Sequence, residues 1–120
     1  MVVRQDGPDT MDDAEVDRIF QALADATRRD VVVRVMREGE SVTALARRYA
    51  MSFAAVQRHV AVLERAGLVR KERHGREQIV RGDVTTVRAA TRLLEEYEEI
   101  WRGRVTRMET LLAEPEGEVP

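Results

Sequence analysis

Residues 41–67 read SVTALARRYAMSFAAVQRHVAVLERAG, and this stretch decides the fold. Apolar residues recur at helical spacing in two short runs, which are separated by Ala50-Met51. Ser41 opens the first run and Ser52 the second, and serine is a preferred N-cap because its hydroxyl accepts a hydrogen bond from an unpaired backbone N–H. Gly67 follows the second run, where a glycine commonly ends a helix. Two short helices joined by a tight turn are typical of a helix-turn-helix motif.

Two further helices are predicted before this motif. Asp12 or Asp13 can cap the first, whose apolar residues share one helical face. These residues are Val16, Ile19, Phe20 and Leu23. Asp25 can cap the second, and Gly39 is expected to end it as a C-terminal glycine. Its expected buried residues are Val31, Val32, Val35 and Met36. The consecutive valines also suit a strand, but the flanking arginines and the glycine favour a helix.

The chain after the motif predicts a hairpin and one long helix. Residues 68–73 and 76–81 are two extended runs separated by His74-Gly75, which fits a tight hairpin turn. Asp83 can cap a final helix that reaches about Ala113, with apolar residues every three or four positions over about eight turns. We therefore predict a mainly α fold with a small β-hairpin. It is a winged helix-turn-helix with four helices, a two-stranded wing and a long C-terminal helix.

The composition excludes several kinds of protein. The chain has 120 residues, which fits one domain, and no cysteine. Disulfides, thiolate metal sites, iron–sulfur clusters and cysteine nucleophiles are therefore excluded. Apolar runs stay well short of about 18 residues and no signal pattern opens the chain, so we expect a cytoplasmic protein with no membrane partner. Residues 1–11 and 114–120 are expected to be disordered tails around one domain, residues 12–113.

Basic residues gather in the middle of the chain. Residues 41–81 hold nine basic and three acidic side chains, whereas residues 1–40 hold six and ten, and residues 82–120 hold five and nine. A basic segment between acidic flanks fits a polyanionic partner. A solvated basic face with internal ion pairs is the alternative.

The helix predicted at residues 52–66 has two distinct faces. Its core face carries Val56, Val60, Leu63 and Phe53, and its opposite face carries small residues, arginines and a glutamine. Small residues let a helix enter the major groove, where Arg can bond guanine and Gln can bond adenine. We therefore predict binding of double-stranded DNA by this helix together with the basic hairpin 68–81. The hairpin cations suit phosphate or minor-groove contact, or protection of a sheet edge. The candidate DNA-binding residues are Ser41, Ser52, Ala54, Gln57, Arg58, His59, Ala61, Arg65, Lys71, Arg73, His74 and Arg76.

Three segments resemble the ArsR/SmtB family of bacterial winged-helix repressors. They are residues 23–29 (LADATRR), 41–46 (SVTALA) and 51–69 (MSFAAVQRHVAVLERAGLV). The resemblance spans about residues 14–112. It implies a homodimer, joined through its first and last helices, that binds an imperfect inverted repeat and represses transcription. It also places Ser52, Gln57, Arg58 and His59 in the recognition helix and residues 73–76 at the wing tip.

The sequence departs from the family pattern at the sites that usually bind metal. Many members sense metals through a cysteine pair in the third helix, where this chain reads ALARR at residues 44–48. Others bind zinc with Asp and His across paired last helices, but the last helix here has no histidine. Ala44 also stands where a Glu is usual, and Ala54 stands where a Pro is frequent. We predict no metal site and no cofactor. An unidentified small-molecule or protein effector remains open.

The row of apolar residues along the long C-terminal helix is longer than the core of so small a domain can cover. We infer a partner helix from a second subunit, which would place two recognition helices on successive major grooves. The alternative is an intramolecular helix with a frayed end. The candidate dimer-interface residues are Val16, Ile19, Phe20, Leu94, Tyr97, Trp101, Val105, Met108 and Leu112.

Other residues fit plainer roles. His59 and His74 lie on separate elements and cannot supply the three or four ligands that zinc usually takes, so His59 is expected to form hydrogen bonds at the DNA margin. The acidic cluster at residues 95–99 fits a solvated face better than a cation site, with arginines nearby to pair with it. We expect Phe53 to pack in the core or against a helix rather than contact a thymine methyl.

The sequence therefore predicts a sequence-specific transcriptional regulator, most simply a homodimeric repressor, and not an enzyme. Three alternatives stay open. A MarR-like regulator belongs to the same class, but it usually has a longer chain and more dimerisation helices. A sequence-indifferent architectural protein would bind DNA without reading it, and a dimeric adaptor would bind an acidic protein instead.

Overall fold

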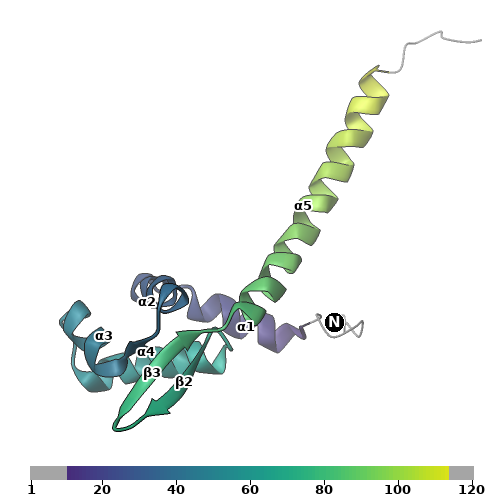
Figure 1. The fold of residues 1–120 in the computed structure, drawn as a ribbon. Helices are drawn as coiled ribbons and strands as arrows, with labels where there is room; N and C mark the ends of the chain where they lie inside the picture. Colours follow the sequence, from purple (N-terminus) through teal and green to yellow (C-terminus); the bar gives the residue numbers. More distant parts are fainter. Residues whose placement is uncertain (1–10, 114–120) are drawn as a thin grey trace, which may run out of the picture. The chain divides into compact units, whose positions relative to one another are not determined.

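A computed structural model describes residues 11–113 and confirms a mainly helical fold with a small antiparallel sheet (Figure 1). The elements in chain order are α1 (Asp13–Ala22), α2 (Ala26–Arg37), β1 (Glu40–Ser41), α3 (Val42–Tyr49), α4 (Phe53–Arg65), β2 (Val69–His74), β3 (Glu77–Gly82) and α5 (Val84–Ala113). The predicted tails lie outside the described residues, except that Met11 packs against the core. Among the helices of residues 11–113, none is long and apolar enough to cross a membrane.

The chain divides into two units between Ala90 and Thr91. The first unit holds α1 to α4, the sheet and the first turns of α5. The second unit holds the rest of α5, which is one continuous helix of 30 residues from Val84 to Ala113.

The predicted caps account for where the helices begin. Asp12 accepts a hydrogen bond from the backbone N–H of Glu15 at 2.8 Å, and Glu15 accepts one from the N–H of Asp12 at 3.0 Å, which makes a reciprocal capping box. Ser41 accepts from the N–H of Ala44 at 3.0 Å. Asp25 and Ser52 cap α2 and α4 in the same way. Each cap satisfies a backbone donor that the first turn of its helix would otherwise leave unpaired.

The end of α4 aims the chain into the wing. Gly67 has a φ of 79°, and its N–H donates to the carbonyl of Glu64 at 2.9 Å. The N–H of Leu68 donates to the carbonyl of Leu63 at 3.0 Å. This pair of bonds is a Schellman motif, and it requires the left-handed conformation that glycine adopts at low cost.

Gly39 directly follows the C-cap of α2, where it was predicted, but it does not adopt the left-handed conformation typical of a C-terminal glycine. Helix α2 ends with Glu38 as its C-cap, whose φ of −162° is extended backbone. Gly39 is instead needed for close approach, because a Cβ there would lie 2.9 Å from the Ile79 side chain.

The sheet corrects the predicted hairpin in two respects. His74 pairs with Glu77, so the two-residue turn is Gly75-Arg76 rather than His74-Gly75. Gly75 has a φ of 64° at the first turn position, which fits a type II′ turn. A third strand is also present, because β1 pairs with β3 through Glu40 with Val80 and Ser41 with Ile79. The strand order is therefore β1-β3-β2.

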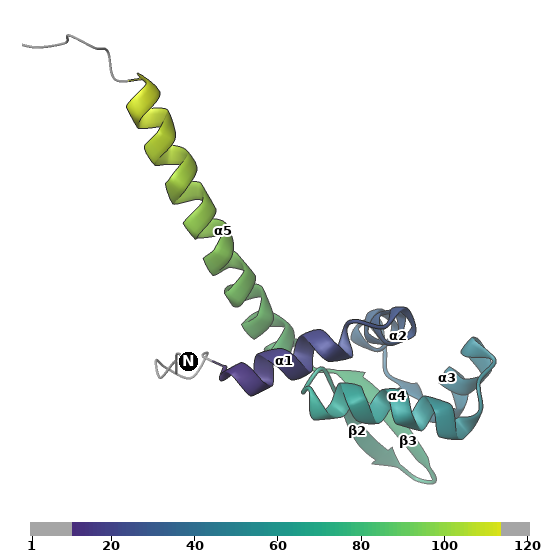
Figure 2. The same ribbon diagram turned by 180° about the vertical axis from the view of Figure 1, so that it is seen from behind.

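One hydrophobic core joins the helices to the sheet in the first unit. Helix α4 contacts α1, α2, α3 and β2, as the reverse view shows (Figure 2). The largest fully buried side chains are Ile19, Val31, Val42, Leu45, Val56, Val60, Leu63, Leu68 and Val80. Every helix of this unit before α5, together with β3 and the loop that follows α4, thus contributes to the core. Since helix packing buries one face of α4, its opposite face is left at the surface.

Candidate nucleic-acid interface

Helix α4 is anchored on one side and open on the other. Val56, Val60 and Leu63 are each at most 2% exposed, so they fix the rotation of the helix about its axis. Ala54, Arg58 and Arg65 are exposed on the opposite side, as the helical wheel predicts. Arg58 makes no ion pair with an acidic side chain of residues 11–113, and its guanidinium is therefore uncommitted within the described chain.

The other candidate DNA-binding residues differ in exposure. Ser52, Arg73, His74 and Arg76 are exposed, whereas Ser41, Gln57, His59, Ala61 and Lys71 are half-buried. All of them lie on three consecutive parts of the first unit, which are the start of α3, helix α4 and the wing. The hydroxyl of Ser52 is already used, because it accepts from the N–H of Ala55 at 3.1 Å. Its role in the fold is therefore to begin the helix.

Phe53 is not a core residue. Its wheel position shares the side of Val56 and Val60, but it is 52% exposed because it is the first residue of α4 and lies beyond the packed turns. It lines a hollow of about 250 Å³ between α3, α4 and the wing. Gln57 lines the same hollow from α4, Thr43 from α3, and Arg73 and Arg76 from the wing. Of the two expected placements of Phe53, packing in the core is wrong, whereas packing against a helix stays a prediction.

His59 is contacted by Arg28 of α2. Its Nδ1 lies 3.4 Å from a terminal guanidinium nitrogen of Arg28. Arg28 also donates from Nε to the carbonyl of Ala22 at 2.8 Å, so it ties the end of α1 to α4. The backbone N–H of Arg28 donates to Asp25 at 3.0 Å and lowers the pKa of that carboxyl. This structural role of Arg28 could not be predicted from the sequence, because its partners are the backbone carbonyls of Ala22 and Gln21, which no side-chain pattern marks.

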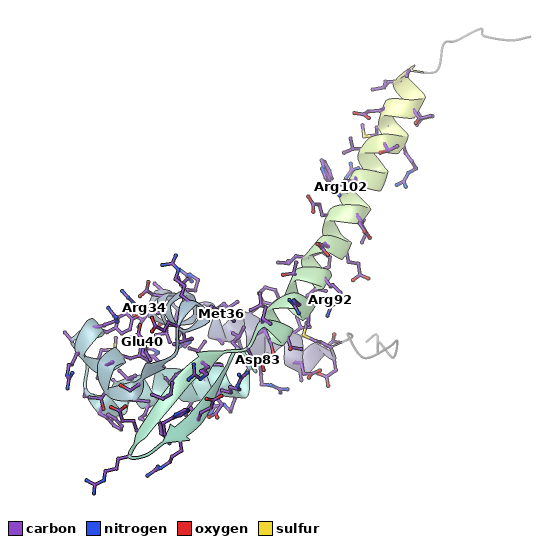
Figure 3. The ribbon with its side chains drawn as sticks, viewed as in Figure 1. Arg34, Met36, Glu40, Asp83, Arg92 and Arg102 are labelled. Carbon is purple, nitrogen blue, oxygen red and sulfur yellow. The ribbon has the colours of Figure 1, made fainter. Side chains whose placement is uncertain are left out.

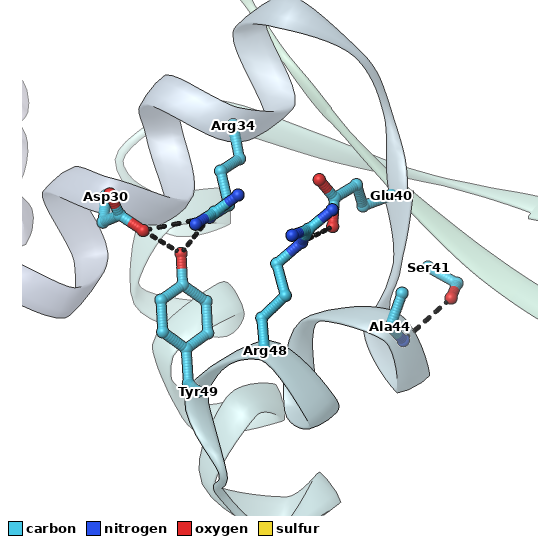
Figure 4. Close-up of polar contacts among 7 residues, drawn as sticks. All are labelled: Asp30, Arg34, Glu40, Ser41, Ala44, Arg48 and Tyr49. Atoms are coloured by element: carbon cyan, nitrogen blue, oxygen red, sulfur yellow. Dashed lines mark hydrogen bonds and ion pairs between the residues drawn. The ribbon is translucent and has the colours of Figure 1, made fainter.

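Helix α3 is tied to α2 and to β1 by polar contacts (Figure 4). The Tyr49 hydroxyl at the end of α3 donates to Asp30 of α2 at 2.5 Å, and Arg34 Nε donates to the same carboxylate oxygen at 3.0 Å. Burial and the bond to Asp30 raise the pKa of Tyr49 to about 12. Arg48 also donates to Glu40 at 2.8 Å. These contacts orient α3 and, through the turn, the start of α4.

The wing presents two kinds of cation. Arg81 donates from Nε to Glu72 at 2.8 Å, and with His74 at 3.3 Å and Arg70 at 3.4 Å it lowers the pKa of Glu72 to about 2. These three side chains are committed to one carboxylate. Arg73 and Arg76 differ, because they are exposed and make no ion pair with an acidic group of the described chain. They are the wing side chains best placed to meet an anionic ligand.

One wing contact reaches helix α4. Lys71 Nζ lies 3.4 Å from Glu64 of α4, so this candidate DNA-binding lysine is partly used to join the wing to the helix.

The part of helix α5 that lies in the second unit of the chain carries a long, exposed stripe of apolar residues. Leu94, Tyr97, Trp101 and Met108 are each at least half exposed, and Leu112 is 83% exposed. Val105 is half-buried. The acidic cluster pairs locally, since Arg102, labelled in Figure 3, donates to Glu98 at 3.0 Å. Within residues 11–113, no group of three or more His, Asp or Glu side chains is placed to hold a metal ion.

The predicted interface residues of α1 do not all face outward. Phe20 is 40% exposed and Val16 is half-buried. Ile19 is 1% exposed and packs in the core, so it is not available to a second chain, which corrects its assignment.

Known proteins share this fold and these segments. A family model described as a helix-turn-helix domain matches residues 23–72. The HTH-type transcriptional regulator Rv2034 of Mycobacterium tuberculosis is 37% identical over 81 residues, which cover 68% of this chain and 76% of that protein. An ArsR-like transcriptional regulator from Rhodococcus sp. RHA1 is 31% identical with a TM-score of 0.72, over 84% of this chain and 94% of the other. The DNA-binding domain of Mb0332 from Mycobacterium bovis, described as a homodimeric winged helix-turn-helix, shares the fold at 23% identity with a TM-score of 0.60, over 72% of this chain and 81% of that chain.

The fold and the exposed basic face together define a winged helix-turn-helix DNA-binding protein. The chain belongs to the ArsR family of helix-turn-helix transcriptional regulators, and it is a DNA-binding regulator of that type. The family and the fold are those of regulators, which are not enzymes.

Proposed function

We propose that this protein is a homodimeric repressor that reads an imperfect inverted repeat through a recognition helix, residues 52–66, and a basic wing, residues 68–81. The observation that carries the proposal is the outward face of α4. Its core face is locked by buried valines and a leucine, so Arg58 is held at the surface with its guanidinium uncommitted among the described residues. A forked donor on a small-residue face suits the edge of a guanine in the major groove.

The neighbouring side chains have complementary roles in this proposal. Gln57 lies beside Arg58 and reads a second base, most simply an adenine. The N-terminus of α4, which Ser52 caps, lies against a backbone phosphate, because the partial positive charge of a helix N-terminus favours an anion. Arg73 and Arg76 grip the phosphate backbone or enter the minor groove. Contacts of this second kind position the protein, and the contacts of Gln57 and Arg58 specify the sequence.

The dimer is proposed from the apolar stripe of α5. Trp101 is 58% exposed and Leu112 is 83% exposed in the single chain, and large apolar surfaces of this kind commonly mark an interface. Val16 and Phe20 of α1 are proposed as further dimer contacts. The Mycobacterium bovis relative is described as homodimeric, which supports the same assembly here. A two-fold dimer would present two α4 helices to half-sites about 34 Å apart.

The effector is proposed not to use the metal ligands familiar in the family. The chain has no cysteine, and its two histidines are His59 on α4 and His74 on the wing. A regulator with this composition would respond to a small organic molecule, to a protein, or to its own concentration.

Selection of genomic fragments by the purified protein, followed by footprinting, tests the proposal. The salt concentration is set at about 0.15 M, where non-specific phosphate binding is weakened. The expected result is a protected inverted repeat whose half-sites are one helical turn apart. Broad enrichment without a shared motif would favour the architectural protein, and no binding to any duplex at low salt would favour an adaptor for an acidic partner.

A further inference from the structure

Phe53 holds an unusual place for a large apolar side chain. It is the first residue of α4 and is 52% exposed, whereas the next residues on its side of the helix, Val56 and Val60, are at most 2% exposed. An isolated exposed hydrophobic residue needs no explanation by itself. Phe53, however, lies at the N-terminal end of α4, the proposed recognition helix. In helix-turn-helix proteins the N-terminal residues of this helix contact base edges.

The surroundings of Phe53 point toward DNA. It shares a hollow of about 250 Å³ with Gln57 and with Arg73 and Arg76 of the wing. Glu77 also lines the hollow, but the two guanidinium groups outnumber its one carboxylate, so the lining keeps a net positive charge that attracts a polyanion. The ring adds an apolar surface, and only one base displays an apolar group in the major groove. That base is thymine, whose C5-methyl group is the sole apolar group on a major-groove edge.

We propose that Phe53 is a specificity-determining residue that reads a thymine through its C5-methyl group. This inference rests on the proposed function of α4 as the recognition helix. Phe53 and Gln57 are four residues apart, so they are neighbours on one helix face with Cβ atoms about 5–6 Å apart. Base pairs rise about 3.4 Å each, so the thymine lies within about two base pairs of the base that Gln57 reads. Arg73 and Arg76 hold the flanking phosphates and keep the ring over the groove.

The test replaces each thymine of the footprinted operator, one at a time, with deoxyuridine, which removes only the methyl group. Binding is measured by fluorescence anisotropy at about 0.15 M salt. Wild-type protein should lose roughly three- to fivefold in affinity at one thymine per half-site, the factor expected for one buried methyl group. The Phe53→Ala variant should bind the operator more weakly and should show no further loss at that thymine. The Phe53→Leu variant should keep part of the methyl effect, because leucine retains an apolar contact.

Val33→Ala is the matched control, because Val33 is also apolar and is 47% exposed but lies on α2. It should keep the wild-type response to deoxyuridine at every position. Thermal unfolding of Phe53→Ala checks that the domain remains folded.

Each other outcome overturns the inference in a distinguishable way. If methyl effects persist unchanged in Phe53→Ala on an intact operator, this inference alone fails. If Phe53→Ala instead changes the oligomeric state, the ring is covered by a second chain and not by a base. If selection yields no operator, the proposed function fails and the inference fails with it.

Discussion

Removal of the Trp101 indole should weaken the proposed dimer strongly. Trp101 is the one tryptophan of the chain and is 58% exposed on α5. A tryptophan buries up to about 250 Å². About 145 Å² of it therefore remains to be covered, which corresponds to about 3–4 kcal/mol per chain at ~25 cal/mol per Å². A two-fold interface loses this contribution twice. Ordering costs and incomplete cover reduce the sum, and about half of it gives a net loss of about 3–4 kcal/mol, or a dimer Kd higher by roughly 150- to 800-fold.

Sedimentation equilibrium across a dilution series measures this change for wild type and Trp101→Ala. Wild-type emission gives a second reading, because the single indole should shift to longer wavelength as the dimer dissociates. Glu99→Ala is the matched control, since Glu99 is exposed on the opposite side of the same helix. A wild-type chain that stays monomeric at tens of micromolar, or a Trp101→Ala variant that dimerises as tightly as wild type, would refute the reasoning.

Three further predictions concern base reading, the end of α4 and the cluster at Tyr49. Arg58→Ala should weaken operator binding by about 1–3 kcal/mol and relax specificity at one base, as competition titration would measure. An equal loss of binding free energy on a scrambled duplex would count against base reading. Gly67→Ala should destabilise the domain by about 1–2 kcal/mol in urea unfolding, because Gly67 has a φ of 79° and a Cβ there would lie 2.9 Å from Thr86 Oγ1. Gly75→Ala, with a φ of 64° and open space around it, should cost less than Gly67→Ala, and equal costs would show that the contact with Thr86 is unimportant. The pKa of Tyr49 is raised from 10.0 to about 12, so the folded chain keeps this proton to a higher pH than the unfolded chain. Its contribution to stability is therefore complete below pH 10 and falls as pH rises toward about 12. The free energy of unfolding, measured by urea titration at a series of pH values, should drop over that window. It should drop less in Tyr49→Phe.

Helix boundaries could be predicted because each depends on a few adjacent residues. Ser41, Ser52 and Asp25 cap the helices that they precede, and Gly67 ends α4 with the expected positive φ. The anchored face of α4 was equally predictable, since period-3.6 spacing alone sets which residues share a side.

Features that depend on contacts distant in sequence could not be predicted. Gly39 was read as a helix stop, but the Ile79 side chain, 40 residues later, is what requires the absence of a side chain there. The helical wheel puts Phe53 on the core face, but it does not show that the packed turns begin only after this residue, which is 52% exposed. Strand β1 has only two residues, which is too short to produce an alternating pattern.

The candidate DNA-binding site could likewise be predicted only in part. The sequence predicts which basic residues of α4 and of the wing face outward. It does not predict which of them form ion pairs or hydrogen bonds within the fold. Lys71 is partly used by Glu64, and His74 is partly used by Glu72, whereas Arg73 and Arg76 stay uncommitted within the described chain. Only the folded arrangement shows which of these side chains already have an acidic partner.

The ratio of two dissociation constants tests the central claim most directly. The full-length protein is titrated with the footprinted operator and with a scrambled duplex of the same length and composition, both at about 0.15 M salt. A sequence-reading regulator should bind the operator at least about 1000-fold more tightly, within the range known for specific DNA-binding proteins. Equal affinities would contradict the account, because the exposed face of α4 would then bind phosphates without reading bases.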